Sequence, residues 1–217
     1  MKVSDAVLSR SSIRAYTKKI VPNEIIKELL ITASRSASGG NLQPWKIYVI
    51  NGASMQAFLD FQSSWDQPEI PGYDIYPPKL KEPYRTSRYD LGEQMYSLLG
   101  IERDNKEARI NQVLKNFTFF GAPAAIFCFV DKQMGPPQWS DLGMFLQSFM
   151  LLAKEAGLDT CAQEAWSLKS DSVSEFVGAD NDDMLFCGMA IGYADKDAPV
   201  NQLTSERRPI DQWATFI

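Results

Sequence analysis

The segment from residue 139 to residue 156 most constrains the fold of this 217-residue chain. Ser140 and Asp141 suit the N-cap and first turn of a helix, and Gly157 suits its end. Apolar residues occupy most sides of that helix: Leu142, Met144, Phe145, Leu146, Phe149, Met150, Leu151 and Leu152. A helix that is apolar nearly all round lies at the centre of a core or in a subunit interface.

Short apolar runs alternate with helical patterns along the rest of the chain. Strands are predicted at residues 45–50, 123–130, 158–161 and 184–193. Helices are predicted at residues 3–9, 22–33, 53–59, 89–115 and 170–177. Strands that are apolar throughout need cover on both faces, so the class is α+β or α/β with a buried sheet.

Residues 65–83 interrupt this pattern. They have no clear period and contain Pro68, Pro71, Pro77, Pro78 and Pro83. No independent core accompanies them, so we interpret them as an excursion from one domain that spans residues 1–217. Residues 194–217 form a polar tail with an aromatic end.

The composition excludes several classes of function. The chain has no histidine, which excludes a Ser-His-Asp triad, a Cys-His dyad and a zinc site with a histidine ligand, and we expect no metal. The formal net charge of −5 argues against a nucleic-acid partner.

Three further features concern the cellular location. Cys128, Cys161 and Cys187 are far apart and lie in apolar runs, which indicates buried free thiols in a reducing compartment. No signal-peptide pattern opens the sequence. The longest apolar stretch, residues 142–156, is too short and too interrupted to cross a bilayer. We therefore expect a soluble cytoplasmic protein with no membrane partner.

Two arginine-bearing stretches suit an anionic ligand. The first is Arg10-Ser11-Ser12-Ile13-Arg14, where two guanidinium groups and two hydroxyls lie within five residues. Arginine donates in a fork to phosphate oxygens, and serine adds hydroxyl and backbone donors. The second is Ser205-Glu206-Arg207-Arg208-Pro209 in the tail. Taken alone, each is more often a solvated basic turn or an exposed tail.

Two other stretches suit a heterocyclic ligand. In the run from Ser36 to Trp45, paired glycines allow close approach of the backbone, and Asn41 and Gln43 carry both donors and acceptors. The run from Gly157 to Trp166 follows the long helix and could place backbone N–H groups beside a ligand. Taken alone, each is more often an ordinary connection between a helix and a strand.

Taken together and in this order, the four stretches resemble the FMN-dependent nitroreductase family. Arg10, Ser12 and Arg14 match its Arg-x-Ser-x-Arg motif. Other matches are Ser38, Gly40, Asn41, Gln43, Pro44 and Trp45 in the loop, Gly157, Leu158 and Thr160 after the long helix, and Arg207 in the tail. Many members have proline before the loop serine, where this chain has Ala37.

The resemblance implies an α+β fold, with a mixed sheet sandwiched by helices, in an intertwined homodimer that binds FMN at its interface. It implies that Arg10 and Arg207 contact the FMN phosphate near Ser11 and Ser12, and that Arg14 reaches the pyrimidine edge. The partner would cover the flavin with Ser38, Gly39, Gly40, Asn41 and Gln43. The backbone of Gln163 and Glu164 would lie near flavin N5, and Lys115 and Asn116 are candidates for a further ring contact.

The function implied is a two-step oxidoreductase. NAD(P)H would reduce FMN, and a small electrophile such as a nitroaromatic or a quinone would then take the electrons. A flavin carries the hydride chemistry, so no catalytic side chain and no histidine are needed. Two alternatives stay open, namely a specialised flavin reaction such as dehalogenation and a flavin-binding module without turnover.

Overall fold

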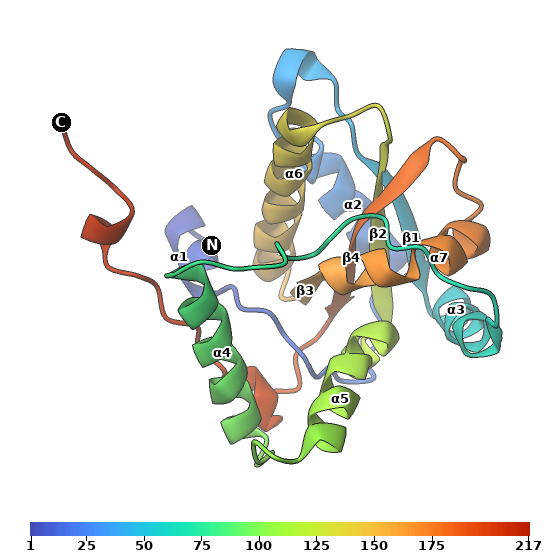
Figure 1. Ribbon diagram of the computed structural model, residues 1–217. Helices are drawn as coiled ribbons and strands as arrows, with labels where there is room; N and C mark the ends of the chain where they lie inside the picture. The colour runs from blue at the N-terminus through green and yellow to red at the C-terminus, as the bar shows by residue number, and fades with distance from the viewer.

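The computed structural model describes residues 1–217 and is built on one four-stranded sheet (Figure 1). The strands are β1 (Lys46–Asn51), β2 (Ala124–Asp131), β3 (Asp159–Gln163) and β4 (Asp183–Gly192), in the order β1-β2-β4-β3. Every pairing between these strands is antiparallel, and the one parallel pairing is an isolated bridge between Ser12 and Thr160. The central strand β2 is buried from Ala124 to Val130, as its apolar sequence predicts.

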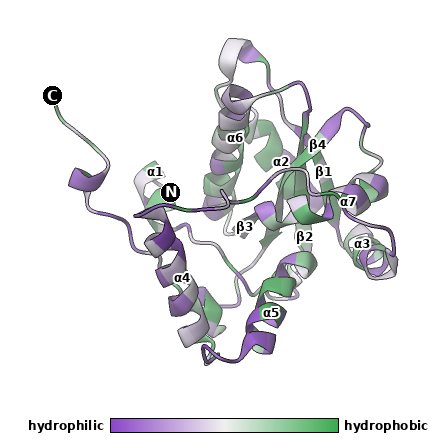
Figure 2. Cartoon of the chain, in the orientation of Figure 1, coloured by the Kyte–Doolittle hydropathy of each residue, from purple (hydrophilic) through white to green (hydrophobic).

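Helices cover both faces of the sheet, which confirms the α+β prediction. One apolar cluster lies between the sheet and helices α2 (Asn23–Ala33) and α6 (Pro136–Glu155). The other lies between the sheet and helices α3 (Ala53–Ser64) and α7 (Ser170–Val177). Figure 2 shows that α4 (Tyr84–Leu98) is mainly hydrophilic, and Figure 1 shows that it stands away from the sheet. None of the helices has the length and hydropathy of a membrane-spanning segment.

The long helix α6 begins earlier than predicted, with a different cap. It begins at Pro136 after Gly135, whose N–H donates to Gln138 Oε1 at 3.2 Å, so Ser140 is not its cap. The Ser140 hydroxyl donates instead to the carbonyl of Pro137. Within the single chain, α6 buries one side against the sheet, while Met144 is 43% exposed.

The helix predicted at residues 89–115 is two helices, and that prediction was wrong. Helix α4 ends at Leu98, and Gly100 follows in the left-handed region at φ 63°, where glycine is favoured. Helix α5 (Lys106–Leu114) then begins with Asn105, whose side chain accepts from the N–H of Ala108 at 3.1 Å. These stop and start signals override the continuous polar pattern.

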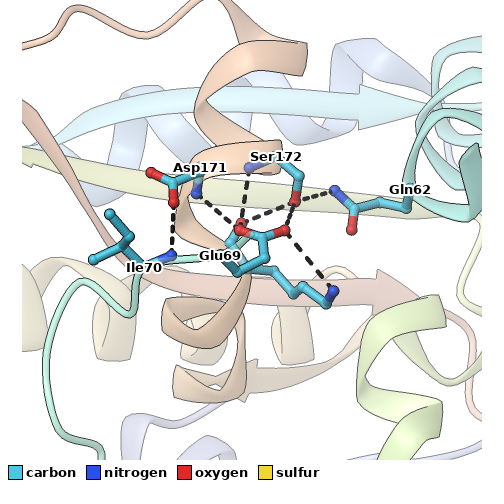
Figure 3. A network of polar contacts seen from close by, with 6 residues as sticks. Gln62, Glu69, Ile70, Asp171 and Ser172 are labelled. Atoms are coloured by element: carbon cyan, nitrogen blue, oxygen red, sulfur yellow. Dashed lines mark hydrogen bonds and ion pairs between the residues drawn. The ribbon is translucent and has the colours of Figure 1, made fainter. Parts of the chain in front are cut away.

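Residues 65–83 form no helix or strand, and a polar network fastens their first half to the body of the protein (Figure 3). Glu69 accepts from the N–H groups of Asp171 and Ser172 at 3.1 and 3.3 Å and from the Ser172 hydroxyl. It therefore supplies the cap that α7 lacks in its own sequence. The Ile70 N–H returns a bond to Asp171 at 2.6 Å. We call this set the Glu69 network: Gln62, Glu69, Ile70, Lys169, Asp171 and Ser172.

Candidate functional site

Two of the four sequence stretches line one cavity of about 630 Å³. Arg10 and Ser12 enter it from the segment after α1 (Val3–Ser9), and Arg207 and Arg208 enter it from the tail. The rest of the lining comes from Pro83, from helix α4 with Thr86, Ser87, Asp90, Leu91 and Gln94, and from the tail with Ser205, Glu206, Pro209 and Gln212. Residues from opposite ends of the chain therefore meet at one place.

The arginines of this cavity differ in their partners. Neither Arg10 nor Arg207 forms an ion pair with a carboxylate. Arg207 is exposed and donates to Ser205 Oγ at 2.7 Å and to two carbonyls of its own tail. Arg208 instead lies over the ring of Tyr84, 5.5 Å from its centroid. Two guanidinium groups without a carboxylate partner favour an anion in this cavity.

The segment that carries Arg10 and Arg14 runs along the edge of the sheet. The Ile13 N–H donates to Thr160 O at 3.1 Å, and the Thr17 N–H donates to Tyr193 O at 2.9 Å. Arg14 is half-buried between these points, and its Nη1 donates to Ser12 O at 3.2 Å. Burial raises the pKa of the neighbouring Cys161 thiol to about 11, and the positive charge of Arg14 opposes that rise. The edge pairing thus holds a charged side chain beside β3.

In the third stretch, the predicted residue Gln163 contacts Asn116. Gln163 ends β3 and is buried, and its Nε2 donates to Asn116 O at 2.8 Å and to Asn116 Oδ1 at 3.2 Å. The Oε1 atom of Gln163 is buried without a partner. Glu164 follows and is exposed, as is Lys115. Asn116 therefore lies beside Gln163, whereas no hydrogen bond joins Lys115 to this stretch.

The loop of the second stretch does not line the cavity within one chain. Gly40, Asn41 and Gln43 have φ values of 57°, 58° and 50°, a left-handed conformation that is uncommon for glutamine. Ser38 Oγ accepts from the Gln43 N–H at 3.0 Å, and the buried Asp141 accepts from the Gly39 N–H at 3.2 Å. Backbone strain of this kind gathers at ligand-binding sites. Ser11 is half-buried and also lies outside the cavity lining.

Two groups of residues at this site were not predicted from the sequence. The α4 residues that line the cavity belong to a polar helix without a motif, so no pattern pointed to them. Asn201 contacts the arginine segment through its side chain, although it lies in the tail. A single asparagine in a polar tail gives no signal in the sequence.

The comparisons with known proteins agree with this arrangement. The family model described as nitroreductase family matches residues 7–193. The chain is 31% identical to a nitrobenzene nitroreductase from Ectopseudomonas oleovorans, over 99% of this chain and 96% of that protein. It is 32% identical to a 4-nitrobenzoate reductase from Pseudomonas putida, over 98% and 95% of the two chains.

A solved structure is similar over the whole chain. It is an FMN and NADPH-dependent nitroreductase NfnB from Sphigopyxis sp. strain HMH, with a TM-score of 0.96 and 40% identity, and the match covers 100% of this chain and 99% of that one. The family model covers the segment with Arg10 and Ser12 and the helix α4, and the two relatives and this structure extend over nearly the whole chain. The chain belongs to the nitroreductase family.

Proposed function

We propose that this protein is an FMN-dependent oxidoreductase that takes hydride from NAD(P)H and reduces small electrophiles such as nitroaromatics or quinones in two steps. The observation that carries the proposal is the meeting of Arg10 and Arg207, both without a carboxylate partner, in one cavity. The similarity to nitrobenzene and 4-nitrobenzoate reductases and to an FMN and NADPH-dependent nitroreductase supports it.

The residues of the cavity fit a flavin phosphate. Arg10 and Arg207 supply charged donors, and the Ser12 hydroxyl supplies a neutral donor in the same cavity, with Ser11 next to it in the chain. FMN, when bound, supplies the hydride acceptor and donor chemistry. Arg14 would hold negative charge at the pyrimidine edge, and the backbone of Gln163 and Glu164 would border N5.

We also propose that the site is completed in a homodimer. The loop that contains Ser38, Gly39, Gly40, Asn41 and Gln43 lies outside the cavity of its own chain, so it is free to cover a flavin in a partner. Exposed apolar side chains on α1 and α6 support this, since Val3 is 75%, Leu8 85% and Met144 43% exposed. Light scattering of the FMN-bound protein should give twice the chain mass, and an active monomer would contradict the dimer.

Two further proposals concern the organisation and location of the chain. Both apolar clusters pack on the same sheet, which supports one domain over residues 1–217. Cys128, Cys161 and Cys187 are buried free thiols, which supports the reducing cytoplasm.

The experiment that tests the proposed function begins with the purified protein. It should be yellow or should take up added FMN, and NADH or NADPH should bleach the flavin absorbance under anaerobic conditions. A panel of nitroaromatics, quinones and halogenated phenols should then restore the absorbance. A protein that fails to bind FMN refutes the proposal. Flavin binding without reduction by NAD(P)H would favour a specialised flavin reaction or a module without turnover.

A further inference from the structure

The side chain of Asn201 joins two segments that carry site arginines. Asn201 lies in the short helix η4 (Pro199–Gln202), six residues before Arg207. Its Oδ1 accepts from the N–H of Arg14 at 2.8 Å. Its Nδ2 donates to the carbonyls of Ala15 and Asp195, each at 2.8 Å. The amide therefore uses its acceptor and both of its hydrogens.

The bond from Arg14 to Asn201 fills a gap in the edge pairing of the arginine segment. Ile13 and Thr17 are held by main-chain bonds to Thr160 and Tyr193, on either side of Arg14. The Arg14 N–H donates to the Asn201 side chain rather than to a strand. A half-buried backbone donor without a partner would be costly, so this bond fixes the backbone from which the Arg14 guanidinium extends.

The same amide also strengthens the connection between the tail and the arginine segment. The main-chain N–H of Asp195 donates to the Ala15 carbonyl at 3.1 Å. The Asn201 side chain adds bonds to the carbonyls of Ala15 and Asp195, so the turn at residues 195–201 is held to the arginine segment by both main chain and side chain. From that turn the tail continues to Arg207, which lines the same cavity as Arg10. The Asn201 side chain therefore reinforces the placement of both arginine-bearing segments.

We propose that Asn201 is a positioning residue for the flavin site, which acts by holding Arg14 at the pyrimidine edge and the Arg207 tail at the phosphate. This proposal rests on the proposed function, because it concerns residues that would bind FMN. Asn201 itself lies outside the cavity lining and touches neither the phosphate region nor the loop of residues 38–43.

The neighbouring residue Gln202 provides a matched control. It belongs to the same short helix and also carries an amide side chain. Its Nε2 donates to the carbonyl of Lys196 at 2.8 Å, and the residue is exposed. Gln202 therefore stabilises the same turn without contact to the arginine segment.

The test compares Asn201→Ala with Gln202→Ala in the FMN-bound protein. In Asn201→Ala, we expect the FMN dissociation constant to rise roughly tenfold and the reduction of bound flavin by NADPH to slow to a similar degree. In Gln202→Ala, both quantities should stay within about twofold of the wild type. The dissociation constant of riboflavin, which lacks the phosphate, distinguishes an effect through the Arg207 tail from an effect through Arg14. A rise for FMN but not riboflavin assigns the effect to the tail, and a rise for both includes Arg14.

A second variant guards against a folding defect. Asn201→Asp keeps an acceptor for the Arg14 N–H, loses both donors and sets a carboxylate oxygen against the carbonyls of Ala15 and Asp195. We expect its flavin affinity to fall at least as far as that of Asn201→Ala, while the melting temperature of the Asn201→Ala apoprotein stays near that of Gln202→Ala. The proposal is overturned if flavin affinity and reduction rate are unchanged in both Asn201 variants. It is also overturned if both variants lose structure while Gln202→Ala keeps it, because the role would then be structural only. Failure of the wild type to bind FMN would instead refute the proposed function.

Discussion

The Glu69 network and the Asn201 contacts both join segments that are distant in the chain, but they do so in different ways. Glu69 and Asp171 are 102 positions apart, and Arg14 and Asn201 are 187 apart. The Glu69 network uses an ionised carboxylate at the start of a helix (Figure 3). The Asn201 contacts use a neutral amide against extended backbone.

Because of this difference, we expect the Glu69 network to contribute to the stability of the fold and the Asn201 contacts to contribute to ligand binding. The Glu69 carboxylate is 12% exposed, accepts from the first N–H groups of α7, and is not among the residues that line the arginine cavity. Asn201 touches the segment that carries two of the arginines expected to bind flavin. We therefore expect changes in the Glu69 network to alter unfolding and changes around Asn201 to alter flavin affinity.

The largest effect should come from Glu69→Ala. It leaves two N–H groups of α7 without their acceptor and leaves the buried Ser172 hydroxyl only the Lys169 carbonyl, so the free energy of unfolding should fall by about 2–3 kcal/mol. For a chain of this size, that corresponds to a melting temperature lower by about 4–12 °C. Thermal unfolding followed by circular dichroism would measure it, and the FMN dissociation constant should stay within about twofold.

Two companion variants sharpen this prediction. Glu69→Gln keeps an acceptor but loses the charge that faces α7 and Lys169, so its melting temperature should lie between those of the wild type and Glu69→Ala. Glu82→Ala removes an exposed carboxylate that pairs with Arg85 and accepts from the Thr86 N–H at the start of α4. Because these contacts are exposed to solvent, the melting temperature should fall much less than in Glu69→Ala. Equal effects of Glu69→Ala and Glu82→Ala would remove the distinction between a buried cap and an exposed one.

The next effect should come from Arg207→Ala, which acts on the ligand instead of the fold. Arg207 is exposed and bonded only within its own tail, so its loss should hardly change the melting temperature. If it contacts the FMN phosphate, its loss should weaken FMN binding by roughly ten- to a hundredfold. Arg10→Ala should behave alike. Titration of apoprotein with FMN by fluorescence quenching measures both, and unchanged affinity in the two variants would exclude this phosphate site.

Arg14→Ala should give a smaller and different effect. A cation at the pyrimidine edge stabilises reduced flavin, so the variant should reduce bound FMN about tenfold more slowly, with weaker effects on FMN affinity. Stopped-flow reduction by NADPH measures the rate. If Arg14→Ala instead reproduces the affinity loss of Arg207→Ala with a normal reduction rate, Arg14 contacts the FMN phosphate and not the pyrimidine edge.

Most of the fold could be predicted from local pattern. The buried strand β2 and the helix α2 follow from apolar runs of the appropriate period, and both occur within a few residues of the predicted bounds. The break between α4 and α5 was missed because Gly100 and Asn105 act through backbone geometry and capping, which a polar helical pattern hides. The Glu69 cap could not be predicted because it depends on a contact 102 positions away.

The candidate site could be predicted only in part. The resemblance named Arg10, Ser12 and Arg207, and the structure brings these three residues into one cavity. The α4 residues and Asn201 reach the site only through the tertiary path of the chain after residues 65–83 and through the tail. Their own sequence contains no motif that predicts this path. The loop of residues 38–43 needs a second chain if it is to complete the site.

The smallest effect should come from Arg208→Ala, and it tests the register of the tail. Arg208 also lines the cavity, but its guanidinium lies over the Tyr84 ring and its carbonyl accepts from Trp213 Nε1 at 3.2 Å. Its side chain is therefore engaged with α4, while the Arg207 side chain has no charged or aromatic partner. We expect FMN affinity in Arg208→Ala to fall by no more than about threefold, measured by the same titration as for Arg207→Ala. A large loss in Arg208→Ala with a normal Arg207→Ala would mean that the phosphate-binding arginine is one position later, and that the Tyr84 contact breaks when FMN binds.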